Sequence, residues 1–131
     1  MPELDVATAN YVTDRKRVAG MGTSGAPTQQ HWRVTISSSA LVILAPLFLF
    51  TFGSILGEPY EAVLAYYAHP IPAAIAALTI LVSMYHFKAG VQVLITDYTR
   101  GFTRKASIVA ATCLSYAIAL IGVFAVIRLA L

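Results

Sequence analysis

The sequence predicts an all-α membrane protein with three transmembrane helices. Of its 131 residues, 58% are hydrophobic and only 11% are charged, whereas a soluble domain averages roughly 25% charged residues. The mean hydropathy of +0.73 points the same way. Long apolar runs follow one another along the chain, and this length allows one small helical bundle.

The three predicted spans cover residues 34–57, 70–95 and 106–128, and each is long enough to cross a membrane. The hydrocarbon core is about 30 Å thick, which takes about 20 helical residues. A helix is the expected structure because its backbone groups satisfy one another in lipid. We expect Pro46 to kink or loosen the first span, because proline cannot donate a backbone hydrogen bond.

The distribution of charge predicts the orientation of the chain. The loop between the first two spans contains two glutamates and no Lys or Arg. By the positive-inside bias, residues 1–33 form a cytoplasmic segment, which we expect to contain no signal peptide, and residues 34–131 form the anchor with its C-terminus on the opposite side. The positive residues that flank the spans on the predicted cytoplasmic side are Arg15, Lys16, Arg17, Arg33, Arg100, Arg104 and Lys105.

Composition also excludes some classes of protein. Basic residues outnumber acidic ones by nine to six, but no basic stripe is interleaved with aromatics, so we do not expect nucleic-acid binding. Cys113 is the one cysteine, which rules out an internal disulfide and a cysteine metal cluster. We expect it to be a small packing residue.

Small residues recur at four-residue spacing in the third span, at Ser107, Ala111, Ser115 and Ala119. Such a stripe lies along one side of a helix and lets a second helix approach closely in lipid. The stripe therefore predicts a partner helix without identifying it.

Polar groups in the second span mark a candidate functional site. Residues 84–98 read MYHFKAGVQVLITDY, and the eleven residues from His86 to Asp97 make about three helical turns. His86, Gly90 and Asp97 therefore share one face, with the histidine about 16 Å deeper than the acid. A neutral imidazole can bind haem iron, and a glycine leaves room for a planar group. Alternatively, the histidine only bonds a neighbouring helix and the glycine only eases packing.

The pattern H-x3-G-x-Q-V-x3-D-Y, from His86 to Tyr98, resembles the smaller membrane-anchor subunit of succinate dehydrogenase, or respiratory complex II. Residues 20–42, GMGTSGAPTQQHWRVTISSSALV, also resemble that family's entry into its first span. There a Gly-x-Gly-Ser/Thr run precedes a Trp and an Arg-x-Thr. Three spans with a cytoplasmic N-terminus agree with the family, and the resemblance covers most of the chain from Val18 onward.

The resemblance implies roles for individual residues. His86 corresponds to an axial ligand of a haem b held in a helical bundle that two anchor subunits share, the other ligand coming from the larger anchor. Tyr98 corresponds to the hydrogen-bond donor to ubiquinone, and Asp97 to its acidic neighbour. Arg33 corresponds to an arginine near the quinone pocket and the haem propionates. His31 corresponds to a further residue at the cofactor site.

Elementary chemistry permits these roles. A phenol can donate to a quinone oxygen, and a carboxylate at the membrane edge can orient water or relay protons. Without the resemblance, Tyr98 would be an interfacial tyrosine and Arg33 a positive-inside arginine. The alternative for Asp97 is an acid at the end of a helix. Lys88 is rotated by about 200° from His86 and has no role implied by the family. It can extend toward the surface or meet an acid of a partner.

The resemblance implies an anchor subunit of succinate:ubiquinone oxidoreductase in the bacterial inner membrane, with a periplasmic C-terminus. It would bind the larger cytochrome b-type anchor and tether the flavoprotein and iron–sulfur subunits, on which succinate is oxidised. The chain itself has no flavin motif and no cysteine cluster. The alternatives are a fumarate reductase anchor and a cofactor-free assembly or scaffold protein of the membrane. A transporter is disfavoured, since three spans leave no internal repeat.

Overall fold

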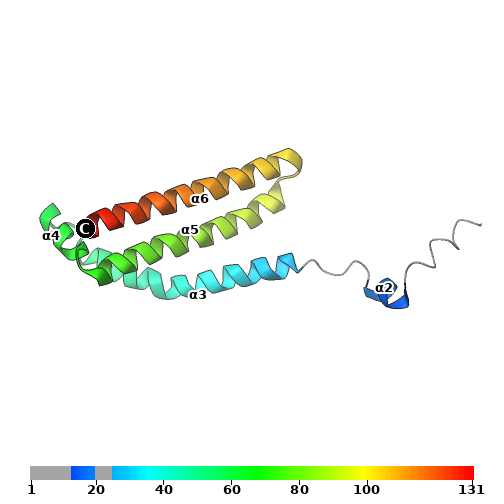
Figure 1. Ribbon diagram of the computed structural model, residues 1–131, viewed down its shortest axis with the longest axis horizontal. Helices are drawn as coiled ribbons and strands as arrows, with labels where there is room; N and C mark the ends of the chain where they lie inside the picture. Colours follow the sequence, from blue (N-terminus) through cyan, green and yellow to red (C-terminus); the bar gives the residue numbers. More distant parts are fainter. Residues whose placement is uncertain (1–12, 20–24) are drawn as a thin grey trace, which may run out of the picture.

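The computed structural model describes residues 13–19 and 25–131, and the ordered elements of this part are helices (Figure 1). No strand occurs among the described residues, which confirms the predicted all-α class. The Gly-x-Gly-Thr run at residues 20–23 lies outside the described part. The helices are α2 (Asp14–Ala19), α3 (Ala26–Gly53), α4 (Tyr60–Tyr67), α5 (Pro70–Tyr98) and α6 (Gly101–Ala130).

Three of these helices are long and apolar enough to span a membrane, namely Thr28–Gly53, Pro70–Tyr98 and Gly101–Ala130. The prediction of three long apolar helices is therefore confirmed. α3 begins before the first predicted span and ends at Gly53, four residues short of that span's predicted end. A proline at the start of α3 is compatible with the first helical turn, where its missing N–H is not needed. The helix continues through Pro46 without interruption. Where the membrane surfaces cross these helices stays a prediction.

The middle span is also the central helix. α5 packs against α3 on one side and α6 on the other, whereas no Cα atoms of α3 and α6 approach within 8 Å among the described residues (Figure 1). The long helices therefore form an open layer, not a closed bundle. Even in α5, only 22% of an apolar 18-residue stretch is buried within the chain. Most of the apolar surface is thus left to lipid or to other subunits.

A tight turn joins α5 to α6. Gly101 has φ +63°, a left-handed conformation in which residues with a Cβ are strained. Arg104 closes the turn, because its Nε donates to the carbonyl of Thr99 at 2.9 Å and its Nη2 to that of Thr96 at 2.8 Å. The last carbonyls of a helix have no N–H partner within it. Arg104, predicted only as a positive-inside residue, therefore also fixes the end of α5 next to Tyr98.

The predicted loop between the first two spans contains the short helix α4. Its Tyr67 is buried in a core with Ala73 and Ala76 of α5 and Val126 of α6. Burial, together with the neighbouring Tyr66, raises the pKa of the Tyr67 phenol. α4 thus ties α5 to α6 at the end of the layer where the C-terminus lies (Figure 1).

The small-residue stripe of α6 faces α5. Ser115 and Ala119 are buried, with only 2% and 6% of their surface exposed. Farther along, a Cβ at Gly122 would lie 3.0 Å from Cγ2 of Ile80, so the two helices are in close contact there. The predicted partner helix is therefore α5. Cys113, in contrast, is exposed and lies outside this helix contact, so its packing role stays a prediction.

We expect Gly122→Leu to lower the free energy of unfolding by roughly 1–3 kcal/mol, because the added side chain must displace Ile80. Gly53→Leu is the matched control, since a Cβ at that helical position meets nothing within 4 Å. Titration of the two variants with a denaturing detergent, in otherwise identical lipid micelles, measures the difference. Equal stability of both variants would contradict the close α5–α6 contact.

Candidate functional site

The histidine of the middle span is bonded to α3. The side-chain oxygen of Ser37 lies 2.9 Å from Nδ1 of His86. His86 is half-buried, whereas Ser37 is only 5% exposed. The pair therefore joins α3 to α5 inside the apolar layer. Sequence reasoning missed this partner, although three consecutive serines in an apolar run were a visible signal.

The hydroxyl of Ser37 has further neighbours that bear on the state of the histidine ring. It lies 3.0 Å from the backbone carbonyls of both Arg33 and Val34. A hydroxyl has one proton to donate and two lone pairs with which to accept. If its proton goes to these carbonyls, the hydroxyl accepts from Nδ1–H of His86, and Nε2 then has a free lone pair. No hydrogen bond to Nε2 is recorded within the described part of the chain.

Gly90 lies one turn beyond His86 on α5. A Cβ at this position would meet nothing within 4 Å, so the packing of this chain does not require a glycine there. The open space predicted beside the histidine is therefore present. Asp97 follows on the same uninterrupted helix, within about 20° of the direction of His86, and it is exposed.

Tyr98 is the last residue of α5, and its side chain is 82% exposed. It lies beside Asp97 in sequence, but twelve residues after His86 it is rotated by about 120° from the histidine on a regular helix. Of the Asp–Tyr pair, only Asp97 therefore shares the face of the imidazole. Both residues belong to the last turn of α5, and this end of α5 lies where α3 begins and α5 turns into α6 (Figure 1).

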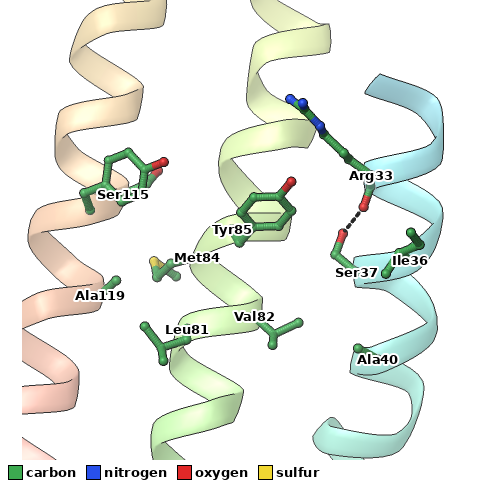
Figure 2. Close-up of a pocket in the computed structure, with 11 residues that line it drawn as sticks. Arg33, Ile36, Ser37, Ala40, Leu81, Val82, Met84, Tyr85, Ser115 and Ala119 are labelled. Atoms are coloured by element: carbon green, nitrogen blue, oxygen red, sulfur yellow. Dashed lines mark hydrogen bonds between the residues drawn. The ribbon is translucent and has the colours of Figure 1, made fainter. Parts of the chain in front are cut away.

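Arg33 lies one turn before Ser37 and lines a groove of about 490 Å³ that crosses α5 between α3 and α6 (Figure 2). Its side chain reaches toward α5 above Tyr85 (Figure 2). The polar groups of this groove are Arg33, Ser37, Tyr85, Ser115 and Tyr116, and its apolar lining is Ile36, Ala40, Leu81, Val82, Met84 and Ala119.

The predicted site residues thus fall in separate places. Neither Asp97 nor Tyr98 lines the groove that Arg33 lines. His31, near the start of α3, is exposed and is also absent from that groove. Within this chain, the structure brings Arg33 close to Ser37 and hence to the level of His86. It does not bring Arg33 to the Asp97–Tyr98 pair.

Lys88, which had no role in the sequence interpretation, has a partner on α6. Its Nζ donates to the hydroxyl of Tyr116 at 2.8 Å and lies 5.0 Å and 4.7 Å from the ring centroids of Tyr85 and Tyr116. Cation–π attraction and a hydrogen bond thus stabilise the charge within the chain. Lys88 also lines a polar pocket of about 220 Å³ that shares Arg33 and Tyr85 with the groove. The lysine therefore contacts a tyrosine pair, and no acid of a partner is needed to explain it.

Among the described residues, no three His, Cys, Asp or Glu side chains gather as a metal site. Haem iron does not need such a cluster, because the porphyrin supplies four ligands and the protein supplies only axial ones. A single accessible histidine is therefore the donor set expected of a chain that shares a haem with a partner.

The comparisons with known proteins agree with this architecture. Residues 10–127 match the family described as succinate dehydrogenase/fumarate reductase transmembrane subunit, so this chain belongs to that family and is a membrane anchor subunit of such an enzyme. It is 40% identical over 121 residues to the succinate dehydrogenase hydrophobic membrane anchor subunit of Paracoccus denitrificans, covering 92% of this chain and 94% of the relative. No solved structure matches the chain. The resemblance stated from the sequence is thereby confirmed.

We expect Tyr116→Phe to lower the free energy of unfolding by about 1 kcal/mol, because Lys88 loses its hydrogen-bond acceptor in an apolar environment while the ring remains. Tyr85→Phe is the matched control, since it keeps the ring beside Lys88 and removes no recorded hydrogen bond. Detergent-induced unfolding measures both. If the control lost as much stability as Tyr116→Phe, the hydrogen bond would not be the stabilising contact.

Proposed function

We propose that this chain carries an axial ligand of haem b, at His86, and part of the ubiquinone-reduction site, at Tyr98, in a succinate:ubiquinone oxidoreductase. Membership of the anchor family supports the general role. The observation that carries the haem proposal is the state of His86. Its Nδ1 is bonded to Ser37, its Nε2 has no recorded partner in the described part of the chain, and Gly90 beside it faces open space.

These features fit a haem ligand better than a simple contact between helices. A simple contact needs only the bond to Ser37, whereas a haem ligand also needs a free ring nitrogen and room for a planar group. Nε2 is free of partners in the described part of the chain, and the position of Gly90 is open. Haem b, when bound, would supply one-electron chemistry near the quinone. The second axial ligand would come from the larger, cytochrome b-type anchor subunit. The guanidinium of Arg33, one turn from Ser37, can pair with a carboxylate such as a haem propionate, and His31 precedes it on the same end of α3.

At the end of α5, Tyr98 and Asp97 would act on the quinone itself. Reduction of a quinone to a quinol takes two electrons and two protons. The phenol of Tyr98 donates a hydrogen bond to a quinone carbonyl and holds it in place. The carboxylate of Asp97 orients water and relays protons from the aqueous side. The proposal also gives Arg33 a part at the quinone site, although within this chain Arg33 lines the groove between α3 and α6, which does not include Tyr98.

The distribution of positive residues supports an N-terminus in the cytoplasm and a C-terminus in the periplasm of a bacterial inner membrane. Arg33, Arg100, Arg104 and Lys105 all lie toward the end of the layer where α3 begins and α5 turns into α6. The flavoprotein and iron–sulfur subunits would bind at that end, close to Tyr98. The same residues would serve a fumarate reductase, in which electrons flow in the opposite direction.

We expect His86→Ala to remove or strongly diminish the haem of the purified complex, because the iron loses one of its two protein ligands. The reduced-minus-oxidised optical spectrum of the complex in mild detergent measures this loss. His69→Ala is the matched control, since His69 precedes α5 at the opposite end of the helix and its side chain makes no capping hydrogen bond. An unchanged haem spectrum in His86→Ala would exclude this residue as a required ligand.

We expect Tyr98→Phe to slow quinone reduction by at least tenfold, the equivalent of about 1.4 kcal/mol, because the bound quinone loses a hydrogen bond. Succinate oxidation measured with a soluble artificial acceptor should stay close to that of the unmodified complex. Tyr60→Phe, at an exposed tyrosine beyond α3, controls for the loss of a hydroxyl. Equal loss of both activities in Tyr98→Phe would count against a direct role at the quinone.

A further inference from the structure

We infer that Ser37 is a positioning residue for His86: its hydroxyl accepts a hydrogen bond from Nδ1–H and so fixes both the tautomer and the direction of the ring. The effect on haem rests on the proposed function, whereas the tautomer of His86 is a property of the chain alone. Ser37 is not among the residues to which the resemblance assigned a role.

The hydrogen bonds of neighbouring serines indicate where the proton of Ser37 goes. Ser38 donates its hydroxyl to the carbonyl of Val34 at 2.8 Å, and Ser39 donates to that of Thr35 at 2.9 Å. The hydroxyl of Ser37 lies 3.0 Å from each of two such carbonyls, those of Arg33 and Val34. Serine in a helix commonly bonds in this way. Once that proton is used, only lone pairs of Ser37 remain to face His86, and the ring must supply the proton.

Burial of Ser37 strengthens its preference for accepting the hydrogen bond from His86. Ser37 is 5% exposed, so water does not compete freely for the 2.9 Å contact with Nδ1. The two ring nitrogens lie on different sides of the imidazole, and a bond from Nδ1 to α3 therefore turns Nε2 away from Ser37. A histidine that binds a metal commonly donates its other N–H to such an acceptor, which fixes its tautomer and increases its basicity as a ligand.

How strongly the Ser37 hydroxyl accepts the hydrogen bond from His86 determines the expected effect on the midpoint potential of the haem. A neutral hydroxyl whose own proton bonds a backbone carbonyl is a weaker acceptor than a carboxylate, and it leaves the imidazole neutral. Loss of this acceptor would make the imidazole a poorer electron donor to iron. The oxidised, more positively charged iron would lose more stabilisation than the reduced iron, so the midpoint potential would rise.

The first test uses the whole complex in mild detergent with three variants of this chain. We expect Ser37→Ala to retain haem with a more positive midpoint potential in a redox titration. Ser37→Thr, which keeps a hydroxyl, should restore a potential near that of the unmodified complex. Ser38→Ala is the matched control, because it removes a hydroxyl that bonds the same backbone carbonyl and has no recorded contact with His86. If Ser37→Ala and Ser38→Ala had the same potential, the positioning role would be overturned.

The second test uses the full chain without haem, in lipid bilayers. Labelling histidine with ¹⁵N in a His31→Gln, His69→Gln background leaves His86 as the one observed ring. We expect Nδ1–H to be the main tautomer, and its ratio to Nε2–H to fall roughly fivefold in Ser37→Ala, since a hydrogen bond contributes about 1 kcal/mol. A main Nε2–H tautomer with Ser37 intact would overturn the inference even if Ser37→Ala failed to assemble. If His86 proved to bind no haem, the proposed function would fail while this measurement still decided the role of Ser37.

Discussion

The polar contact between Ser37 and His86 is the interaction on which the rest of this structure depends. A polar group inside hydrocarbon needs a partner, because its desolvation is costly when no hydrogen bond replaces water. Ser37 provides that partner to Nδ1 from the neighbouring helix. A single hydroxyl can satisfy only one side of the ring, however. The contact therefore stabilises the α3–α5 pair and at the same time leaves the second ring nitrogen available.

Two further polar contacts join α5 to α6, on the side of α5 opposite to its contact with α3. Lys88 bonds Tyr116 at 2.8 Å, and Gln92 donates to Thr112 at 3.3 Å, both across the α5–α6 contact. α5 is therefore held from both sides, which fixes its rotation about its own axis. That rotation decides which of its residues face α3, which face α6 and which remain open, and Gly90 is among the open ones.

Much of this arrangement could be predicted from the sequence, but not the contacts between helices. Apolar runs predict the three long helices, and the eleven-residue spacing correctly relates His86 to Asp97 along one helix. The orientation predicted from Arg and Lys stays a prediction. Pairing with Ser37 could not be derived, because it depends on how α3 and α5 are rotated relative to each other. The contacts of Lys88 with two tyrosines and the separation of the groove from Tyr98 could not be derived either. Periodicity within one helix carries no information about how the neighbouring helix is rotated.

Three features of the chain lie open to its surroundings. α3 and α6 flank α5 without closing over it, a glycine of α5 faces open space, and Tyr98 at the end of that helix is 82% exposed. In a membrane such positions can be filled by lipid, by another chain or by a cofactor, and each restores the packing energy that open space would forgo. For an anchor subunit, these positions are where another chain and a cofactor can complete the structure. In the proposed function this site is one half of a shared site, and its chemistry would depend on how firmly Ser37 holds His86.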